Sequence, residues 1–148
     1  MNGDEPAVQF TKTEEAAKTP TYAHTGDTGA DLCCLSSFAL APGEIVGAKT
    51  GLCVAFPPGY GGQVRSKSGL ALKGLSVIGG VIDNAYRGEI VVILQNTGKM
   101  AQYFTAGDKV GQLVLERVEQ AHFLEVSTLP DPLPGYDRGA AGFGSTGR

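Results

Sequence analysis

The chain has 148 residues, of which 22 are glycine and 8 are proline, and it carries a formal net charge of −3. Hydrophobic residues make up 42%, and the glycines show no period of three, so the composition predicts one globular domain and excludes collagen and whole-chain disorder. Lysine and arginine occur singly, and no apolar run reaches the length of a membrane helix, so we expect neither direct nucleic-acid binding nor a membrane partner.

The cysteines give a prediction about the compartment. Cys33, Cys34 and Cys53 are odd in number and lack the spacing of zinc ligands, which predicts buried, reduced thiols. The N-terminal residues MNGDEPAVQFTK contain no apolar stretch of the kind found in signal peptides. We therefore expect an intracellular protein, cytoplasmic or nuclear.

Strand-like segments predominate in chain order. After a segment at 1–6 that we expect to be disordered, Val8 and Phe10 alternate with polar residues and predict an edge strand. Further strands are predicted at 32–40, 44–56, 62–68, 89–96 and 109–118, and turn clusters at 41–43, 57–62, 96–98 and 105–108. One helical turn is predicted at 68–74. The fold class is therefore all-β, an antiparallel barrel or sandwich, in a domain at 1–130.

The C-terminal segment 131–148 is rich in glycine and proline and predicts a flexible arm. Residues 142–147 match G-x-G-x-x-G, but a dinucleotide fold requires a helix after this pattern, and only one residue follows it. The arm nevertheless holds groups that suit a nucleotide. Arg138, Ser145 and Thr146 can donate hydrogen bonds to phosphate oxygens, and the ring of Phe143 can stack on a base. A disordered tail without a ligand is the alternative.

A second glycine-rich segment, GGVIDNAYRGE at 79–89, resembles a β-hairpin with an accessible backbone at its tip. Asp83 follows the apolar Val81 and Ile82, and partial desolvation would raise the pKa of such a carboxylate toward the range of a general base. The alternative is a turn aspartate that accepts bonds from its own backbone.

Three further segments carry weaker signals. In the segment from Arg65, Lys67 and Ser68 precede Gly69 at a predicted helix start, which suits an anion but also an ordinary serine cap. The segment from Gly107 offers Asp108, Lys109 and Gln112, or simply a turn before a strand. The segment from Thr25 sets Asp31 beside glycines.

Taken together, these five segments resemble the five motifs of the homotrimeric dUTPase family over roughly residues 7–148. They are TGDTGADL, RSKSGLALKG, GGVIDNAYRGE, GDKVGQLV and the terminal FGSTG. The resemblance implies a jelly-roll subunit, a homotrimer with sites at subunit interfaces, and an arm that closes over a site. It also implies hydrolysis of dUTP to dUMP and pyrophosphate with Mg²⁺ on the triphosphate, which limits uracil in DNA and supplies dUMP for thymidylate synthesis.

The resemblance also implies roles for single residues. The segment from Gly80 to Val91, with Val81 and Ile82, would bind uracil and leave no room for a thymine methyl group. Tyr86 would exclude a ribose 2′-hydroxyl, and Asp83 would activate the attacking water. Asp31 would approach Mg²⁺ through water. The implied phosphate contacts are Lys67, Ser68, Gly69, Gln112, Arg138, Gly144, Ser145 and Thr146, and Phe143 would cover the uracil ring.

The sequence departs from the family pattern at several positions. Lys67 and Lys109 each replace an arginine, so they keep the charge but lose the bidentate fork. Ala30 replaces an aromatic residue, Gly111 an alanine and Ala141 a glycine. None of these changes removes the base or the sugar gate that the resemblance implies.

Two other functions remain open at this point. A deoxycytidine triphosphate deaminase shares the fold, although the YRGE and FGSTG sequences favour the uracil enzyme. A jelly-roll binding module without catalysis is the other, and the presence of Asp83 and Tyr86 argues against it.

Overall fold

The computed structural model describes residues 5–135. Arg138, Phe143, Gly144, Ser145 and Thr146 lie outside the described residues, as does most of the segment expected to be disordered at 1–6. The elements are β1 (Gln9–Lys12), β2 (Gly29–Cys33), β3 (Phe38–Leu40), β4 (Ile45–Ala55), β5 (Tyr60–Arg65), α1 (Ser68–Ala71), β6 (Leu75–Val77), β7 (Val81–Ile82), β8 (Glu89–Asn96), β9 (Gln102–Phe104) and β10 (Lys109–Arg117).

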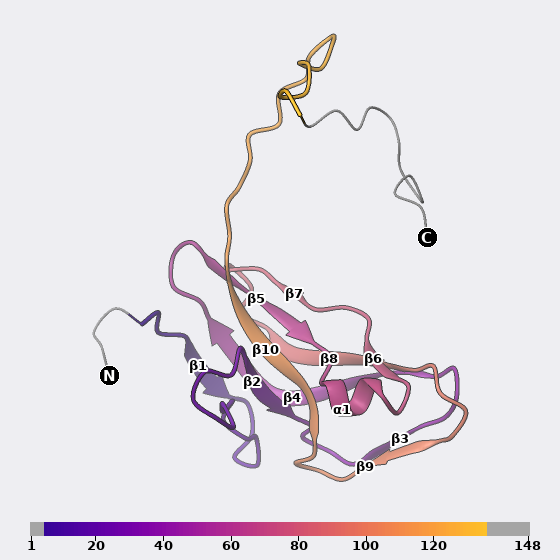
Figure 1. Ribbon diagram of the computed structural model, residues 1–148. Coiled ribbons are helices and arrows are strands. Elements are labelled where there is room, and N and C mark those ends of the chain that lie inside the picture. The colour runs from indigo at the N-terminus through magenta and orange to yellow at the C-terminus, as the bar shows by residue number, and fades with distance from the viewer. Residues whose placement is uncertain (1–4, 136–148) are drawn as a thin grey trace.

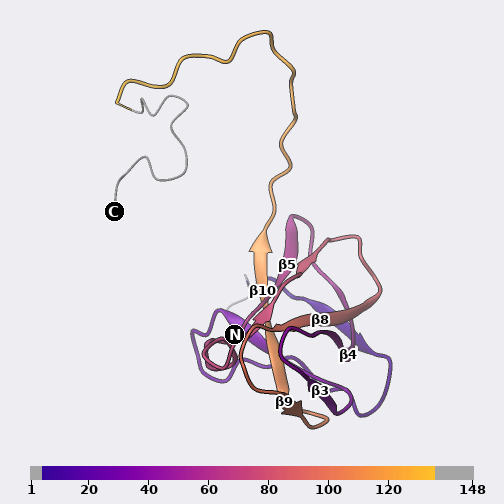
Figure 2. The ribbon, with the colours of Figure 1, turned by 90° about the vertical axis from the view of Figure 1, so that its right-hand side faces the viewer.

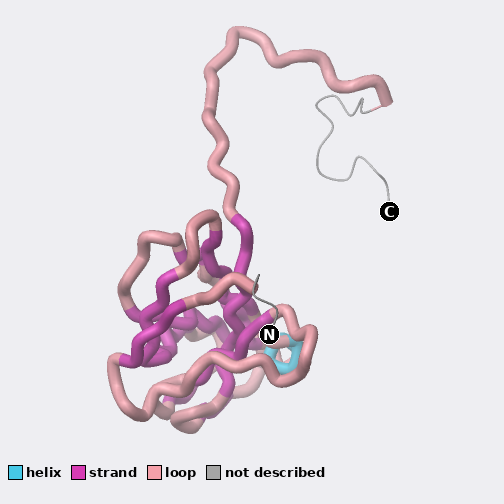
Figure 3. Tube along the Cα trace, turned by 90° about the vertical axis from the view of Figure 1, so that its left-hand side faces the viewer, coloured by secondary structure: helices cyan, strands magenta, loops and turns pink. Residues whose placement is uncertain are grey.

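The strands form two four-stranded sheets, with orders β1-β4-β8-β6 and β2-β10-β5-β7, and a small pair β3-β9 at one end (Figures 1 and 2). The strand pairs of these sheets are antiparallel, and neighbours in a sheet are mostly distant in sequence. Eight strands in two such sheets make a jelly roll. The all-β fold class is therefore confirmed, and α1 is a single short helix at the side of the strands (Figure 3).

The core lies between the two sheets and follows from alternation along the strands. In β8 every second residue is buried, including Ile90, Val92 and Leu94. Leu32 on β2 and Val110 on β10 are fully buried in the same cluster, which joins the second sheet to the first. These apolar side chains fix which face of each strand points outward and therefore where polar side chains collect.

Two predictions about strands are wrong. The segment 32–40 is not one strand, because β2 and β3 belong to different sheets. The segment 79–89 is not a hairpin, because β7 pairs with β5 whereas β8 pairs with β4 and β6. Gly80 explains the second difference: it has φ 142°, its carbonyl accepts a bond from Val64 N at 2.8 Å, and a Cβ there would collide with the Val64 carbonyl. The chain is thereby held on β5.

The cysteines are only partly as predicted. All three are free in the described structure, and Cys34 is buried, but Cys33 and Cys53 are half-buried. The Cys34 thiol donates to the carbonyl of Thr105 at 3.2 Å. Burial raises the pKa of the Cys33 and Cys34 thiols, which keeps both protonated near neutral pH.

The chain leaves the sheets where β10 ends, and residues 118–135 extend away from them (Figures 1 and 2). Apolar side chains on this segment are uncovered: Phe123 is 93% exposed and Leu129 is 81% exposed. No helix in the described part of the chain has the length and apolarity needed to cross a membrane.

Candidate functional site

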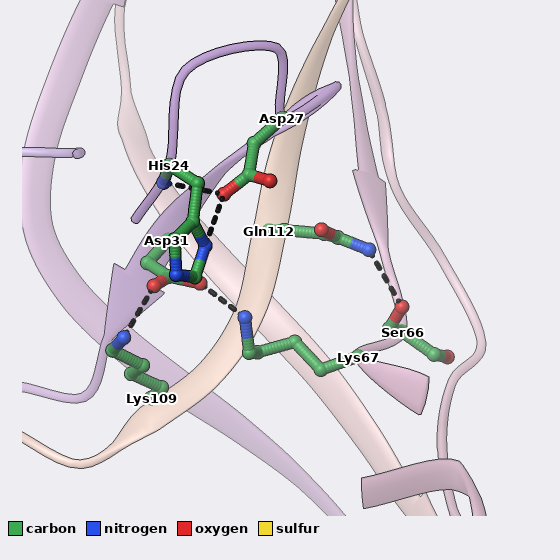
Figure 4. Close-up of polar contacts among 7 residues, drawn as sticks. All are labelled: His24, Asp27, Asp31, Ser66, Lys67, Lys109 and Gln112. Carbon is green, nitrogen blue, oxygen red and sulfur yellow. Dashed lines mark hydrogen bonds and ion pairs between the residues drawn. The ribbon is translucent and has the colours of Figure 1, made fainter. Parts of the chain in front are cut away.

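Three segments that are far apart in sequence meet at one buried carboxylate (Figure 4). Asp31 lies on β2 and is 5% exposed. Its Oδ1 accepts a hydrogen bond from the ammonium of Lys67, which precedes α1. Its Oδ2 lies 2.6 Å from Nζ of Lys109 at the start of β10, although off the direction of a well-aligned hydrogen bond. Two ammonium groups therefore surround one carboxylate, and the cluster keeps a net positive charge.

The charges of this cluster follow from its contacts. Burial raises the pKa of Asp31, but the contacts and positive charges of Lys109 and Lys67 outweigh burial, so the pKa lies below its ordinary value. Asp31 in turn raises the pKa of Lys109. At neutral pH the carboxylate is ionised and Lys109 is protonated.

The two lysines border a hollow of about 430 Å³. It is lined by Lys67, Ser68, Gly69, Leu70, Lys73, Lys109 and Gln112. Among the described atoms, nothing lies within 4 Å of the position that a Cβ on Gly69 would take, so this backbone faces open space. Three lysines and little acidic compensation make the hollow suitable for a polyanion such as a phosphate chain.

Local backbone geometry positions the polar side chains that line the hollow. Lys67 occupies the N-cap position of α1, and no described side chain caps this helix, so the alternative of Ser68 as a cap is wrong. Gln112 on β10 donates from Nε2 to the Ser66 carbonyl at 3.0 Å (Figure 4). Gly29 on β2 leaves the space that the Gln112 side chain occupies, because a Cβ there would collide with it.

The segment 80–88 is a second candidate region. Asp83 is exposed, and so is Val81 at 70%, so the apolar neighbours do not provide the expected desolvation of this carboxylate. Val81, Ile82 and Asp83 border a groove of about 890 Å³ beside Tyr60. Asp83 is also the first residue of a turn, because its backbone carbonyl accepts a hydrogen bond from Tyr86 N at 3.0 Å.

Tyr86 packs back onto its own loop. Its hydroxyl donates to the Glu89 carbonyl at 3.0 Å, its ring lies where a Cβ on Gly88 would be, and it is 44% exposed. Val91 lies on β8 opposite Lys49. Among the described residues, neither Tyr86 nor Val91 lines the hollow or the groove.

The hollow and the groove lie toward opposite ends of β5. Gln112 pairs with Arg65 at one end, whereas Ile82 pairs with Gly62, three residues away. At about 3.4 Å per residue this separation along the strand is roughly 10 Å. The described linings share no residue, so the hollow and the groove are separate within one chain.

The described residues do not form a magnesium site of their own. They contain no group of three or more His, Cys, Asp or Glu side chains that could hold a metal ion. The family resemblance implies that Asp31 approaches Mg²⁺ through water, but both oxygens of its carboxylate already face ammonium groups. The side chains of the described residues alone therefore do not fit Mg²⁺.

Sequence reasoning missed two residues that the structure brings into these regions. Lys73 lines the hollow, and its place at the end of the predicted helical turn was a usable signal. Asn84 donates from Nδ2 toward three carbonyls, of Phe56, Pro57 and Tyr60. These acceptors lie 24–28 residues earlier in the chain, so no local pattern indicates the contacts.

Fold and charge define the class first: a jelly-roll protein with a basic hollow suited to phosphate groups. Comparison with known proteins gives the family, because the dUTPase family model matches residues 15–147. A deoxyuridine 5′-triphosphate nucleotidohydrolase of Thermobifida fusca is 44% identical over 144 residues, covering 95% of this chain and 78% of that protein. The chain belongs to the dUTPase family.

Solved structures agree on the fold. A Staphylococcus bacteriophage 80alpha dUTPase with dUPNHPP is similar with a TM-score of 0.88 at 24% identity, covering 96% of this chain and 99% of that one. A dUTPase from phage phi11 of S. aureus, described with a structural Mg(II) ion, has a TM-score of 0.79 at 24% identity. It covers 84% of this chain and 99% of that one.

Proposed function

We propose that this chain is a dUTP diphosphatase, which hydrolyses dUTP to dUMP and pyrophosphate. The observation that carries the proposal is the basic hollow in which Asp31 holds Lys67 and Lys109, because it joins three of the family motifs at one place. Free thiols support an intracellular, reducing compartment, cytoplasmic or nuclear, for this activity.

The hollow is the proposed phosphate subsite. Lys67 would contact a phosphate oxygen while Asp31 holds its ammonium in place, and Lys109 would add positive charge from the other side of the same carboxylate. Ser68 and Gly69 offer a hydroxyl and an uncovered backbone, and Gln112 offers an amide on the opposite wall.

The segment 80–91 is the proposed uracil and sugar subsite. Its backbone would read the polar edge of uracil and leave no space for a methyl group, and Tyr86 would stand against the deoxyribose. Asp83 would take a proton from a water molecule as its oxygen bonds to the α-phosphorus. The bond from that phosphorus to the bridging oxygen breaks, and pyrophosphate leaves with the electron pair.

A homotrimer is part of the proposal, and two features support it. The phosphate hollow and the Asp83 groove do not meet within one chain, so a complete site requires a second copy. The extended segment 118–135 carries exposed Phe123, Leu124 and Leu133, which another subunit would cover. Apposition of subunits would also supply the desolvation that Asp83 lacks in the single chain.

The C-terminal arm 131–148 is proposed to close over the site, with Arg138 on a phosphate and Phe143 on the uracil ring. Because the arm adds contacts without building the core, truncation after Pro134 is expected to leave a folded protein with little activity. Circular dichroism and pyrophosphate release measure the two effects. A fully active truncated protein would contradict the closing arm.

Magnesium enters the proposal only as a partner of the triphosphate, since the side chains of residues 5–135 do not form a site for it. When bound to the substrate it would neutralise phosphate charge. The remaining work of binding and orientation falls to Lys67, Lys109 and the segment 80–91.

Release of pyrophosphate from dUTP, dTTP, UTP and dCTP, with and without Mg²⁺, tests the proposed function. We expect turnover of dUTP alone. Ammonia release from dCTP would identify the deaminase instead, and lack of turnover with every substrate would favour a binding module.

A further inference from the structure

The loop 83–88, between β7 and β8, is internally rigid. The Asp83 carbonyl accepts from Tyr86 N at 3.0 Å, and the Tyr86 hydroxyl bonds the Glu89 carbonyl. Arg87 donates from one guanidinium nitrogen to the carbonyls of Asn84 and Tyr86, at 2.6 and 2.8 Å. These bonds are all local to the loop, so both its position and the persistence of its own bonds depend on how it is attached to the rest of the protein.

Apart from the flanking strands β7 and β8, the side chain of Asn84 attaches this loop to a neighbouring turn. Asn84 Nδ2 lies 2.8 Å from the Tyr60 carbonyl, 3.0 Å from that of Pro57 and 3.3 Å from that of Phe56. All three partners are acceptors, so the nitrogen rather than the oxygen of the amide must face them. The side-chain amide has two hydrogens for these three acceptors, so at least one hydrogen is shared between two carbonyl oxygens.

Two of the acceptors, Pro57 and Tyr60, belong to a rigid turn, and Phe56 directly precedes it. Tyr60 N donates to the Pro57 carbonyl at 3.1 Å, and Gly59 has φ 78°. Proline at the second position and glycine with positive φ at the third are the pattern of a type II β-turn, and the ring of Pro58 restricts its φ. Val118 N, just after β10, donates to the Gly59 carbonyl at 2.8 Å and ties this turn to the sheet.

We propose that Asn84 is a positioning residue that sets the width of the proposed uracil and sugar subsite by fixing the loop 83–88 to the turn 57–60. This inference rests on the proposed function, in which segment 80–91 reads the base. Asp83 is the direct neighbour of Asn84, so the same attachment orients the proposed base. Loss of the attachment lets the loop move outward and admits a larger pyrimidine.

The test compares three variants of the full chain. Asn84→Ala removes the donor, Asn84→Asp places a carboxylate against three carbonyls, and Asn84→Ser is the mildest change and keeps one short donor. Ser37→Ala is the matched control: its hydroxyl accepts a bond from Ala106 N at 2.9 Å and so joins two exposed loops near the β3-β9 pair. Thermal unfolding verifies that each variant is folded.

The main readout is the ratio of kcat/KM for dUTP to that for dTTP. A pocket discriminates one methyl-sized group by roughly 10–200-fold, so we expect this ratio to fall about tenfold or more in Asn84→Ala and Asn84→Asp. It should fall less in Asn84→Ser and stay at the parent value in Ser37→Ala. An unchanged ratio in folded Asn84 variants overturns the proposal, even where both rates fall, because a merely structural role would lower both alike.

Amide hydrogen exchange separates this inference from the proposed function. Faster exchange at 83–88 in Asn84→Ala, but not in Ser37→Ala, is expected whatever the nucleotide, since the attachment is made by the protein alone. A parent protein without dUTP turnover would refute the proposed function while this exchange result still reports the attachment. Unchanged exchange at 83–88 would show that Asn84 does not hold the loop.

Discussion

The phosphate hollow and the loop 83–88 are fixed by different forces. In the hollow a buried carboxylate holds two ammonium groups by charge. The loop is held by neutral bonds from Asn84 to backbone carbonyls and by a short pairing of β7 with β5. The difference suits the two halves of a nucleotide: a phosphate chain is recognised through charge, whereas a flat base is recognised through shape and bond direction.

Asp83→Asn tests the loop 83–88, which is held by neutral bonds, and has the largest expected effect. A positioned general base contributes roughly 10²–10⁴-fold, about 3–5 kcal/mol of barrier, so kcat for dUTP should fall by that factor. Binding of a non-hydrolysable dUTP analogue should not weaken, because the hollow is intact. Pyrophosphate release and calorimetry measure the two quantities.

The matched control for this change is Glu44→Gln. The Glu44 carboxylate accepts from Ala41 N at 2.8 Å within its own turn, outside the hollow and the groove, and the variant should turn over dUTP at the parent rate. Parent-like turnover in Asp83→Asn would show that the base lies elsewhere.

Asp31→Asn tests the half that is held by charge. It removes the buried carboxylate that two ammonium groups share, but Lys67 and Lys109 are 29% and 53% exposed and solvent compensates part of the loss. We expect the free energy of unfolding at pH 7 to fall by about 1 kcal/mol. Urea unfolding measures it.

The difference in the free energy of unfolding between the parent and Asp31→Asn should depend on pH in a definite direction. The pKa of Asp31 is lower in the folded state than its ordinary value of 3.8, so its contribution is complete above that value. It disappears as pH falls through the lower pKa of the folded state. The gap between parent and Asp31→Asn should therefore close with acidification below that pH, and a gap that widens there would contradict the assigned contacts.

The sequence was sufficient for the strands whose apolar residues alternate, such as β4 and β8, and for the segments that bear the family motifs. It was not sufficient where backbone bonds come from distant residues. The apolar run from Leu32 suggested a continuous strand, yet Cys34 N donates to the Asp108 carbonyl and Gly107 N donates to the Cys34 carbonyl, which bends the chain between β2 and β3.

The same limit applies to the candidate site. Asp31 and Gln112 face each other only because of the register between β2 and β10, which a single sequence does not encode locally. Two lysines on one carboxylate likewise come together only in the folded chain, since the sequence suggested an anion site or a serine cap around Lys67 and a turn before a strand around Lys109. The contacts of Asn84 depend on a turn formed some two dozen residues earlier.

Lys67→Arg, with the smallest expected effect, asks whether charge alone is sufficient in the hollow. The Lys67 ammonium already bonds Asp31, so the geometry left for a phosphate oxygen is that of a point charge. A guanidinium has a planar fork and can hold the carboxylate with one edge and a phosphate with another. We therefore expect KM for dUTP to fall about threefold with kcat unchanged.

Lys12→Arg on β1, an exposed strand away from the hollow, makes the same chemical change and should leave KM at the parent value. If Lys67→Arg raised KM instead, Lys67 would act mainly as a partner of Asp31, because the bulkier fork would then disturb the carboxylate cluster without gaining a phosphate contact. Steady-state kinetics with both variants distinguishes a residue that binds substrate from one that only completes the charge cluster.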